Sequence, residues 1–178
     1  MLITVILFSQ LTLMATSFQM AGFSAQKAAN INSLVNLCAF PVNIAAGWLL
    51  DKYGARVVST LSYLMVALSA VFMTVFFNNG STLFLVLFAV TNALCRPYIS
   101  MHIYVSGELF GKNATAVQPR LYSFTSLGSI VITPLVSALA EKWGGYAKMG
   151  PVWVVCSLVL IVTWLVAYKV SKKENCAE

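Results

Sequence analysis

Arg96 is the residue of this chain whose position most strongly suggests chemistry. It lies inside a long apolar stretch and is the only charged residue between Val57 and Gly107. A guanidinium is a planar fork of donors that can bind a carboxylate through two hydrogen bonds. Three interpretations stay open: Arg96 binds an anionic substrate in a water-filled cavity, it pairs with an acid from a second unit, or it snorkels to water.

Amide side chains at helical spacing accompany Arg96. Asn92 precedes it by one helical turn, so the two would lie in one polar stripe. Asn36 and Asn43 are seven residues apart, which places them on one face of another helix, and Gln10 precedes both. Amides between membrane helices can also serve only as packing contacts. We predict that Arg96, Asn92, Asn36, Asn43 and Gln10 bind the substrate.

Other chemistries lack a sequence pattern. There is no nucleophile paired with a base and no phosphate-binding loop, and the four cysteines have no CxxC spacing. The bases are scattered and form no stripe, so a nucleic-acid partner is not expected. We therefore expect a non-enzyme without catalytic residues, metal or cofactor.

The composition indicates an integral membrane protein. The chain of 178 residues is 60% hydrophobic and 9% charged, against about 25% charged in a soluble domain. Uncharged stretches are long enough for helices of about 20 residues, which cross a bilayer, and Asn78 to Ser81 forms a turn within the longest stretch. The sequence predicts six transmembrane helices, at about Leu2–Ala21, Asn30–Leu50, Val57–Phe77, Thr82–Val105, Leu121–Ala140 and Pro151–Tyr168.

The bases predict an orientation. Six spans put both termini on one side, together with seven bases: Lys52, Arg56, Lys112, Arg120, Lys169, Lys172 and Lys173. Lys27, Lys142 and Lys148 fall on the other side. Cytoplasmic loops of membrane proteins carry an excess of Lys and Arg. We therefore expect both termini in the cytoplasm, and the protein in the plasma (inner) membrane.

A short internal repeat divides the chain. Leu50 to Gly54 reads LDKYG, and Ala140 to Gly144 reads AEKWG, 90 positions later (144 − 54 = 90). Each half would hold three helices, and an odd number turns the second half upside down relative to the first. We expect a single domain over residues 1–178, an all-α bundle built from inverted repeats of about 1–89 and 90–178.

The first copy of this repeat carries a family resemblance. Gly47, Asp51, Lys52, Gly54 and Arg56 resemble the G-x-x-x-D-R-x-G-R-R loop of the major facilitator superfamily, between its second and third helices. Members of that family have twelve helices in two six-helix halves and are secondary transporters. The resemblance implies that this chain corresponds to one half, most similar to the carboxyl-terminal one, with Lys52 and Ala55 departing from the motif.

The resemblance also implies roles and a substrate class. The five motif residues would form a gating loop that latches the cytoplasmic side against the other half. The segments GFSAQKAANINSLVNL and GELFGK are most similar to the oxalate/formate antiporter and monocarboxylate transporter groups, although Asn43 stands where the former often carry arginine.

We therefore expect a transporter of a small organic anion that works by alternating access. No carboxylate lies inside the spans, which favours anion exchange or uniport. A second six-helix half or a homodimer would complete the pathway, with lipid as the other partner. The alternative is a non-transporting truncated fragment, or a membrane interaction protein that needs a second half.

Overall fold

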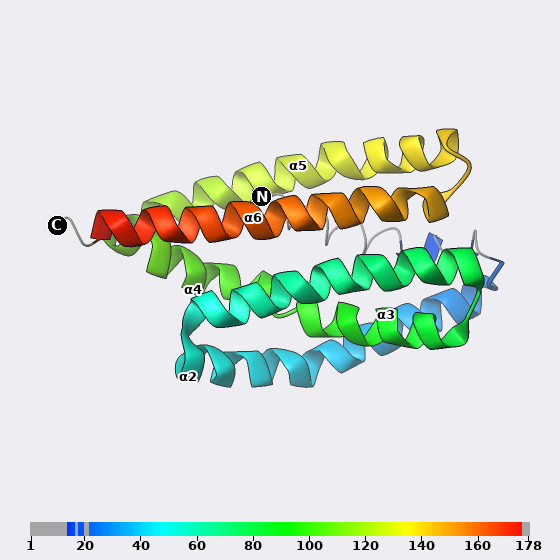
Figure 1. The fold of residues 1–178 in the computed structure, drawn as a ribbon, viewed down its shortest axis with the longest axis horizontal. Helices are drawn as coiled ribbons and strands as arrows, with labels where there is room; N and C mark the ends of the chain where they lie inside the picture. Colours follow the sequence, from blue (N-terminus) through cyan, green and yellow to red (C-terminus); the bar gives the residue numbers. More distant parts are fainter. Residues whose placement is uncertain (1–13, 17, 20–21, 176–178) are drawn as a thin grey trace.

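The computed structural model describes residues 14–16, 18–19 and 22–175, and all regular structure in these ranges is helical. Residues 14–16 and 18–19 are helical and belong to the first expected span, most of which lies outside the described residues. The elements that follow are α2 (Ala25–Asn79), α3 (Thr82–Cys95), α4 (Tyr98–Phe110), η1 (Gly111–Asn113), α5 (Ala114–Lys142), η2 (Tyr146–Met149) and α6 (Gly150–Asn175). The helices run along the long axis of the molecule (Figure 1).

Helix α2 is a hairpin of two helices. Gly54 has φ 76° and ψ 164°, which is not helical and suits only glycine. The chain reverses there, and the arm 55–79 runs back beside the arm 25–53 (Figure 1). Ala28 and Val35 of the first arm share a buried cluster with Ala70 and Met73 of the second. The second and third expected spans are thus confirmed as helices, joined by one residue and not by a loop.

The fourth expected span, 82–105, is broken in the middle. α3 ends at Cys95 and α4 begins at Tyr98, with Arg96 and Pro97 between them. Pro97 has no N–H to donate to the carbonyl of Ala93, and its ring crowds that carbonyl. The bond from residue 97 to Ala93 is therefore missing, and the N–H of Arg96 donates to the Ala93 carbonyl instead, at 3.3 Å, while both residues keep φ and ψ near helical values.

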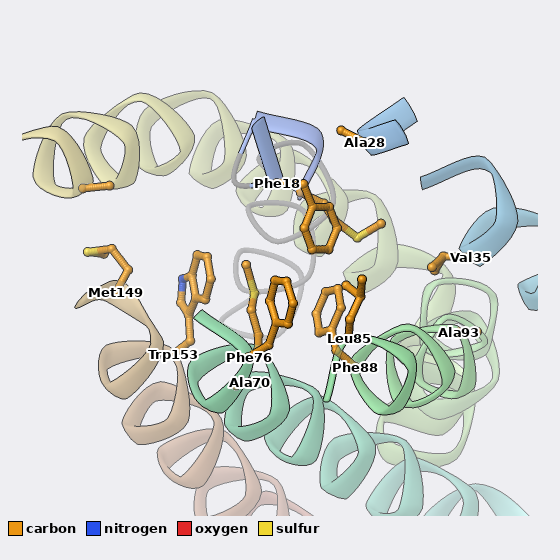
Figure 2. Packing of buried hydrophobic residues seen from close by; sticks show 13 residues of the cluster. Phe18, Ala28, Val35, Ala70, Phe76, Leu85, Phe88, Ala93, Met149 and Trp153 are labelled. Atoms are coloured by element: carbon orange, nitrogen blue, oxygen red, sulfur yellow. The ribbon is translucent and has the colours of Figure 1, made fainter. Parts of the chain in front are cut away.

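Aromatic rings fill the part of the core in which residues of α2, α3 and α6 pack around Phe18 (Figure 2). The ring of Phe18 is 6.0 Å from those of Phe76 and Phe88, each in an edge-to-face arrangement. Edge-to-face pairs contribute about 0.5–1.5 kcal/mol beyond their buried area. Met149 and Trp153 extend this cluster to the start of α6.

The turns of the bundle fall at its two ends. The reversal at Gly54, the α4–α5 connection and the end of α6 lie at one end (Figure 1). The start of α2, the α2–α3 turn and the α5–α6 connection lie at the other. Gly80 closes α2 in the left-handed conformation and donates its N–H to the carbonyl of Phe76 at 2.7 Å. The seven bases predicted to share one side thus belong to segments that meet at one end.

Two helices qualify as membrane spans by length and apolar composition among the described residues. They are Ala25–Asn79, which folds back at Gly54, and Gly150–Val170. α3 is apolar but has only 14 residues, because the break at Pro97 ends it. The helical character of the chain is confirmed, whereas the arrangement of six spanning helices stays a prediction.

Gly150 of α6 lies directly against Thr74 of the second arm of α2. A Cβ at this position would collide with the hydroxyl oxygen of Thr74 and lie 2.8 Å from its Cβ. We expect Gly150→Ala to destabilise the fold by about 1–3 kcal/mol, the usual cost of overpacking, measured as a lower melting temperature in detergent.

Two variants control for this effect. Thr74→Ala removes the colliding oxygen and should restore part of the stability lost in Gly150→Ala. Gly107→Ala in α4 should be tolerated, because nothing lies within 4 Å of its added Cβ. Equal melting temperatures for Gly150→Ala and wild type would show that the two helices do not pack this closely.

Candidate functional site

Arg96 stands at the helix break with its side chain partly buried. Its Nε donates to Oδ1 of Asn92 at 3.2 Å, and its Nη1 donates to Oδ1 of Asn36 at 3.0 Å. The first bond follows from the one-turn spacing on α3, and the second crosses to the first arm of α2. The structure therefore brings together three of the residues predicted to bind substrate.

Two donors in this cluster are left over. The Nη2 of Arg96 and the Nδ2 of Asn92 are buried, and neither has a hydrogen-bond partner among the described residues. Asn92 itself is fully buried, so water does not reach its amide from outside. A buried donor without a partner costs about 1–3 kcal/mol, and more when it is charged. The site thus offers one charged and one neutral donor to an acceptor that carries negative charge.

The first arm of α2 exposes two different faces. Asn36, Asn43 and Gly47 lie on one face by helical spacing, and all three are exposed. Leu37, Ile44 and Trp48, one position further along, form an apolar face that is also exposed. Hydrocarbon suits the apolar face but not amides, which need hydrogen-bonding partners. The amide face is therefore expected to meet water or protein.

Asn43 and Gln10 are not joined to the Arg96 cluster. Asn43 shares the face of Asn36, two turns further along the helix, and it has an interaction of its own. Gln10 lies outside the described residues. The structure thus brings Arg96, Asn92 and Asn36 together, and the substrate-binding roles of all five residues stay predictions.

The predicted gating loop is the reversal of α2. Gly54 makes the turn, and the Lys52 ammonium lies 5.0 Å from the centre of the Trp48 ring and 5.4 Å from that of Tyr53. Asp51 is exposed. A glycine in a helix can let a neighbouring helix approach closely, but no described residue lies within 4 Å of a Cβ placed at Gly47. A helix that packs against Gly47 would have to come from outside the described part of the chain.

Sequence analysis missed the contacts that hold Arg56. Its guanidinium lies over the ring of Tyr168 at 5.1 Å, and its carbonyl accepts a hydrogen bond from Thr60 at 2.7 Å. The Thr60 oxygen also accepts from Nε1 of Trp164 at 3.1 Å. Trp164 and Tyr168 are one turn apart on α6. This aromatic pair just before the basic tail is the sequence feature that could have predicted the contacts of Arg56.

The sequence as a whole matches one family model. The model of the Major Facilitator Superfamily matches residues 1–175. The chain belongs to the Major Facilitator Superfamily. Comparison with curated proteins and with solved structures gives no significant match. The members of this superfamily are transporters and not enzymes, so the expected class, an all-helical membrane transporter, is confirmed.

Because the sequence predicts an anion at Arg96, the neutrality of Asn92 should matter for binding in this facilitator. Asn92→Asp keeps the shape of the side chain but places a carboxylate 3.2 Å from Nε of Arg96. That internal ion pair would satisfy the guanidinium and repel an incoming anion. We expect the affinity for a carboxylate to fall about tenfold or more, measured by tryptophan fluorescence titration of the purified protein.

The matched variant is Asn92→Ser, which is neutral and leaves the Arg96 charge without an internal counter-ion. It should lose less affinity than Asn92→Asp. Equal losses in the two variants would mean that the shape of Asn92, and not its neutrality, decides binding.

Proposed function

We propose that this facilitator moves a small organic anion, a monocarboxylate or dicarboxylate, by alternating access, as an exchanger or uniporter. Arg96 would hold the carboxylate with Asn92 and Asn36 beside it, and Asn43 and Gln10 would line the path. The residues Gly47, Asp51, Lys52, Gly54 and Arg56 would form the gate. The observation that carries this proposal is the pair of buried donors without partners, on Arg96 and Asn92.

The unpaired edge of the guanidinium has the donors that a carboxylate needs, but Nη2 is buried in this conformation, so an anion would reach it only after the neighbouring helices move apart. Nε and one hydrogen of Nη1 are directed to the two amide oxygens, which leaves the second hydrogen of Nη1 and both hydrogens of Nη2. A carboxylate can bridge Nη1 and Nη2 through two parallel hydrogen bonds. Its charge would also offset the cost of a guanidinium at this depth, about 2.5–3.5 kcal/mol on insertion scales.

The hydrogen bond between Arg96 and Asn36 suggests how binding could be coupled to movement. It links the break between α3 and α4 to the first arm of α2, and Asn36 is exposed, so this bond can exchange with water or ligand. A carboxylate that competes for Nη1 would loosen this link and let the two elements shift. Such a shift of packed helices is one established form of transporter and domain motion.

The proposed assembly has six spanning helices in one domain, residues 1–178, arranged as inverted repeats of about 1–89 and 90–178. Both termini would face the cytoplasm from the plasma membrane. A second six-helix unit, supplied by another chain or by a second copy, would form the opposite wall of the path. The exposed amide face of α2 supports this, since it is unsuited to lipid.

The proposal is tested by anion exchange in liposomes. Liposomes with the purified protein are loaded with unlabelled formate, lactate, oxalate or malonate, and uptake of the same labelled anion is followed. We expect uptake of at least one of them well above that of protein-free liposomes. Uptake at the protein-free rate for all four anions would contradict transport of small carboxylates by this chain.

A further inference from the structure

The internal repeat is also a structural repeat. Gly54 and Gly144 both have positive φ, 76° and 85° respectively. The residues four positions before them, Leu50 and Ala140, are both buried. The acid, base and aromatic residue between are exposed in both copies: Asp51, Lys52 and Tyr53 in the first, and Glu141, Lys142 and Trp143 in the second. The two segments thus agree in the sign of φ at the glycine, in burial and in charge.

The two copies lie at opposite ends of the bundle. The first forms the reversal of α2, and the second ends α5 before the connection to α6 (Figure 1). An inverted repeat predicts this placement, because it relates the two ends of the molecule. The second segment is therefore placed to make, at its own end of the bundle, the same kind of contact that the first segment makes at the opposite end.

The acidic residues in these segments destabilise the helices that carry them. Asp51 lies in the last turn of the first arm of α2, and Glu141 lies in the last turn of α5. The carboxyl end of a helix carries partial negative charge, so an acid there is unfavourable. The glycines alone are enough to make the turns. Two exposed acids at unfavourable positions therefore indicate a positively charged contact from outside this bundle.

We infer that the segment Ala140–Gly144 is a second contact surface for the partner unit, equivalent to Leu50–Gly54 at the opposite end. The partner is a second six-helix bundle that presents a basic side chain or a helix amino terminus to Asp51 at one end and to Glu141 at the other. Trp143, like Tyr53, adds exposed aromatic area to its contact. This inference rests on the proposed alternating access, in which the two contacts form in turn, each closing one side of the path.

Opposite effects on access from the two sides test this inference. Ala29 and Asn43 lie on the face of Asn36, seven residues before and after it, so each is about 10 Å from Asn36 toward a different end. Ala29→Cys and Asn43→Cys are made separately in a chain whose four native cysteines are replaced by serine. Labelling by a membrane-impermeant maleimide is then measured in membrane vesicles of both orientations.

The measured quantity is the ratio of labelling of Ala29→Cys to labelling of Asn43→Cys. We expect Glu141→Gln to raise this ratio about fivefold, because the substitution weakens closure at the end of the bundle that holds Glu141 and Ala29. Asp51→Asn should shift the ratio in the opposite direction. Lys27→Gln changes a charge at the same end as Glu141, in the first turn of α2 and outside both copies of the repeat, and it should leave the ratio unchanged.

No shift with Glu141→Gln, or shifts in the same direction for the two acids, would overturn the inference. A second measurement in the same vesicles asks whether oxalate protects Arg96 from modification by phenylglyoxal. It distinguishes failure of this inference from failure of the proposed function. Protection without opposite shifts rejects only the second contact surface, whereas loss of protection rejects the anion site.

Discussion

Arg96→Gln is expected to lose carboxylate affinity by about 30-fold or more while the protein still inserts and folds. The side chain gives up its charge and both hydrogen bonds of the fork, and truncating one partner of a buried charge pair costs about 2–5 kcal/mol. Removing a guanidinium from the expected fourth span would also remove its insertion cost. Neutralisation should therefore leave the melting temperature of the empty protein equal to or above that of wild type.

Binding of labelled oxalate and thermal stability are measured on the same preparation. Arg96→Lys is the matched control, since it keeps the charge but replaces the planar fork by a point charge, and it should bind between wild type and Arg96→Gln. A variant Arg96→Gln that binds oxalate like wild type would remove Arg96 from the site. A variant that fails to fold would instead assign Arg96 a structural role.

Gly54→Val is expected to prevent correct folding. The φ of 76° and ψ of 164° at Gly54 are nearly closed to residues with a Cβ, and a branched side chain is the least suited to them. The strain is about 1–3 kcal/mol, and the alternative is a helix that continues through residue 54. A continuous α2 of 55 residues would be about 80 Å long, far beyond the bilayer core. We expect a large fall in the yield of monodisperse protein from membranes.

Gly47→Ala is the control for this variant. Gly47 lies inside the same arm with helical geometry and open space around its added Cβ, so alanine should preserve or raise stability. Wild-type yield and melting temperature for Gly54→Val would show that the reversal does not depend on glycine.

Local spacing was enough to predict part of the site. The spacing of Asn92 and Arg96 predicted a shared stripe, and the structure joins them by a hydrogen bond. The break after Arg96 also has a local cause, because Pro97 removes a donor wherever it stands in a helix. These features depend on residues within one turn of each other, where periodicity determines which side chains meet.

Contacts between helices could be predicted only in part. Asn36 was expected at the site, but its bond to Arg96 links residues 60 positions apart and depends on how α2 packs on α3. The contacts of Arg56 with Tyr168 and of Trp164 with Thr60 were missed for the same reason. The single-residue reversal at Gly54 was also missed, since a positive φ is a property of the packed hairpin and glycine only permits it.

The central claim, that Arg96 binds a carboxylate, is tested most directly by chemical protection. The chain has three arginines, Arg56, Arg96 and Arg120, and phenylglyoxal modification of each can be measured by peptide mass spectrometry. Oxalate, lactate or formate should slow modification of Arg96 in a concentration-dependent way while Arg56 and Arg120 react as before. Equal rates at Arg96 with and without every one of these carboxylates would contradict the claim.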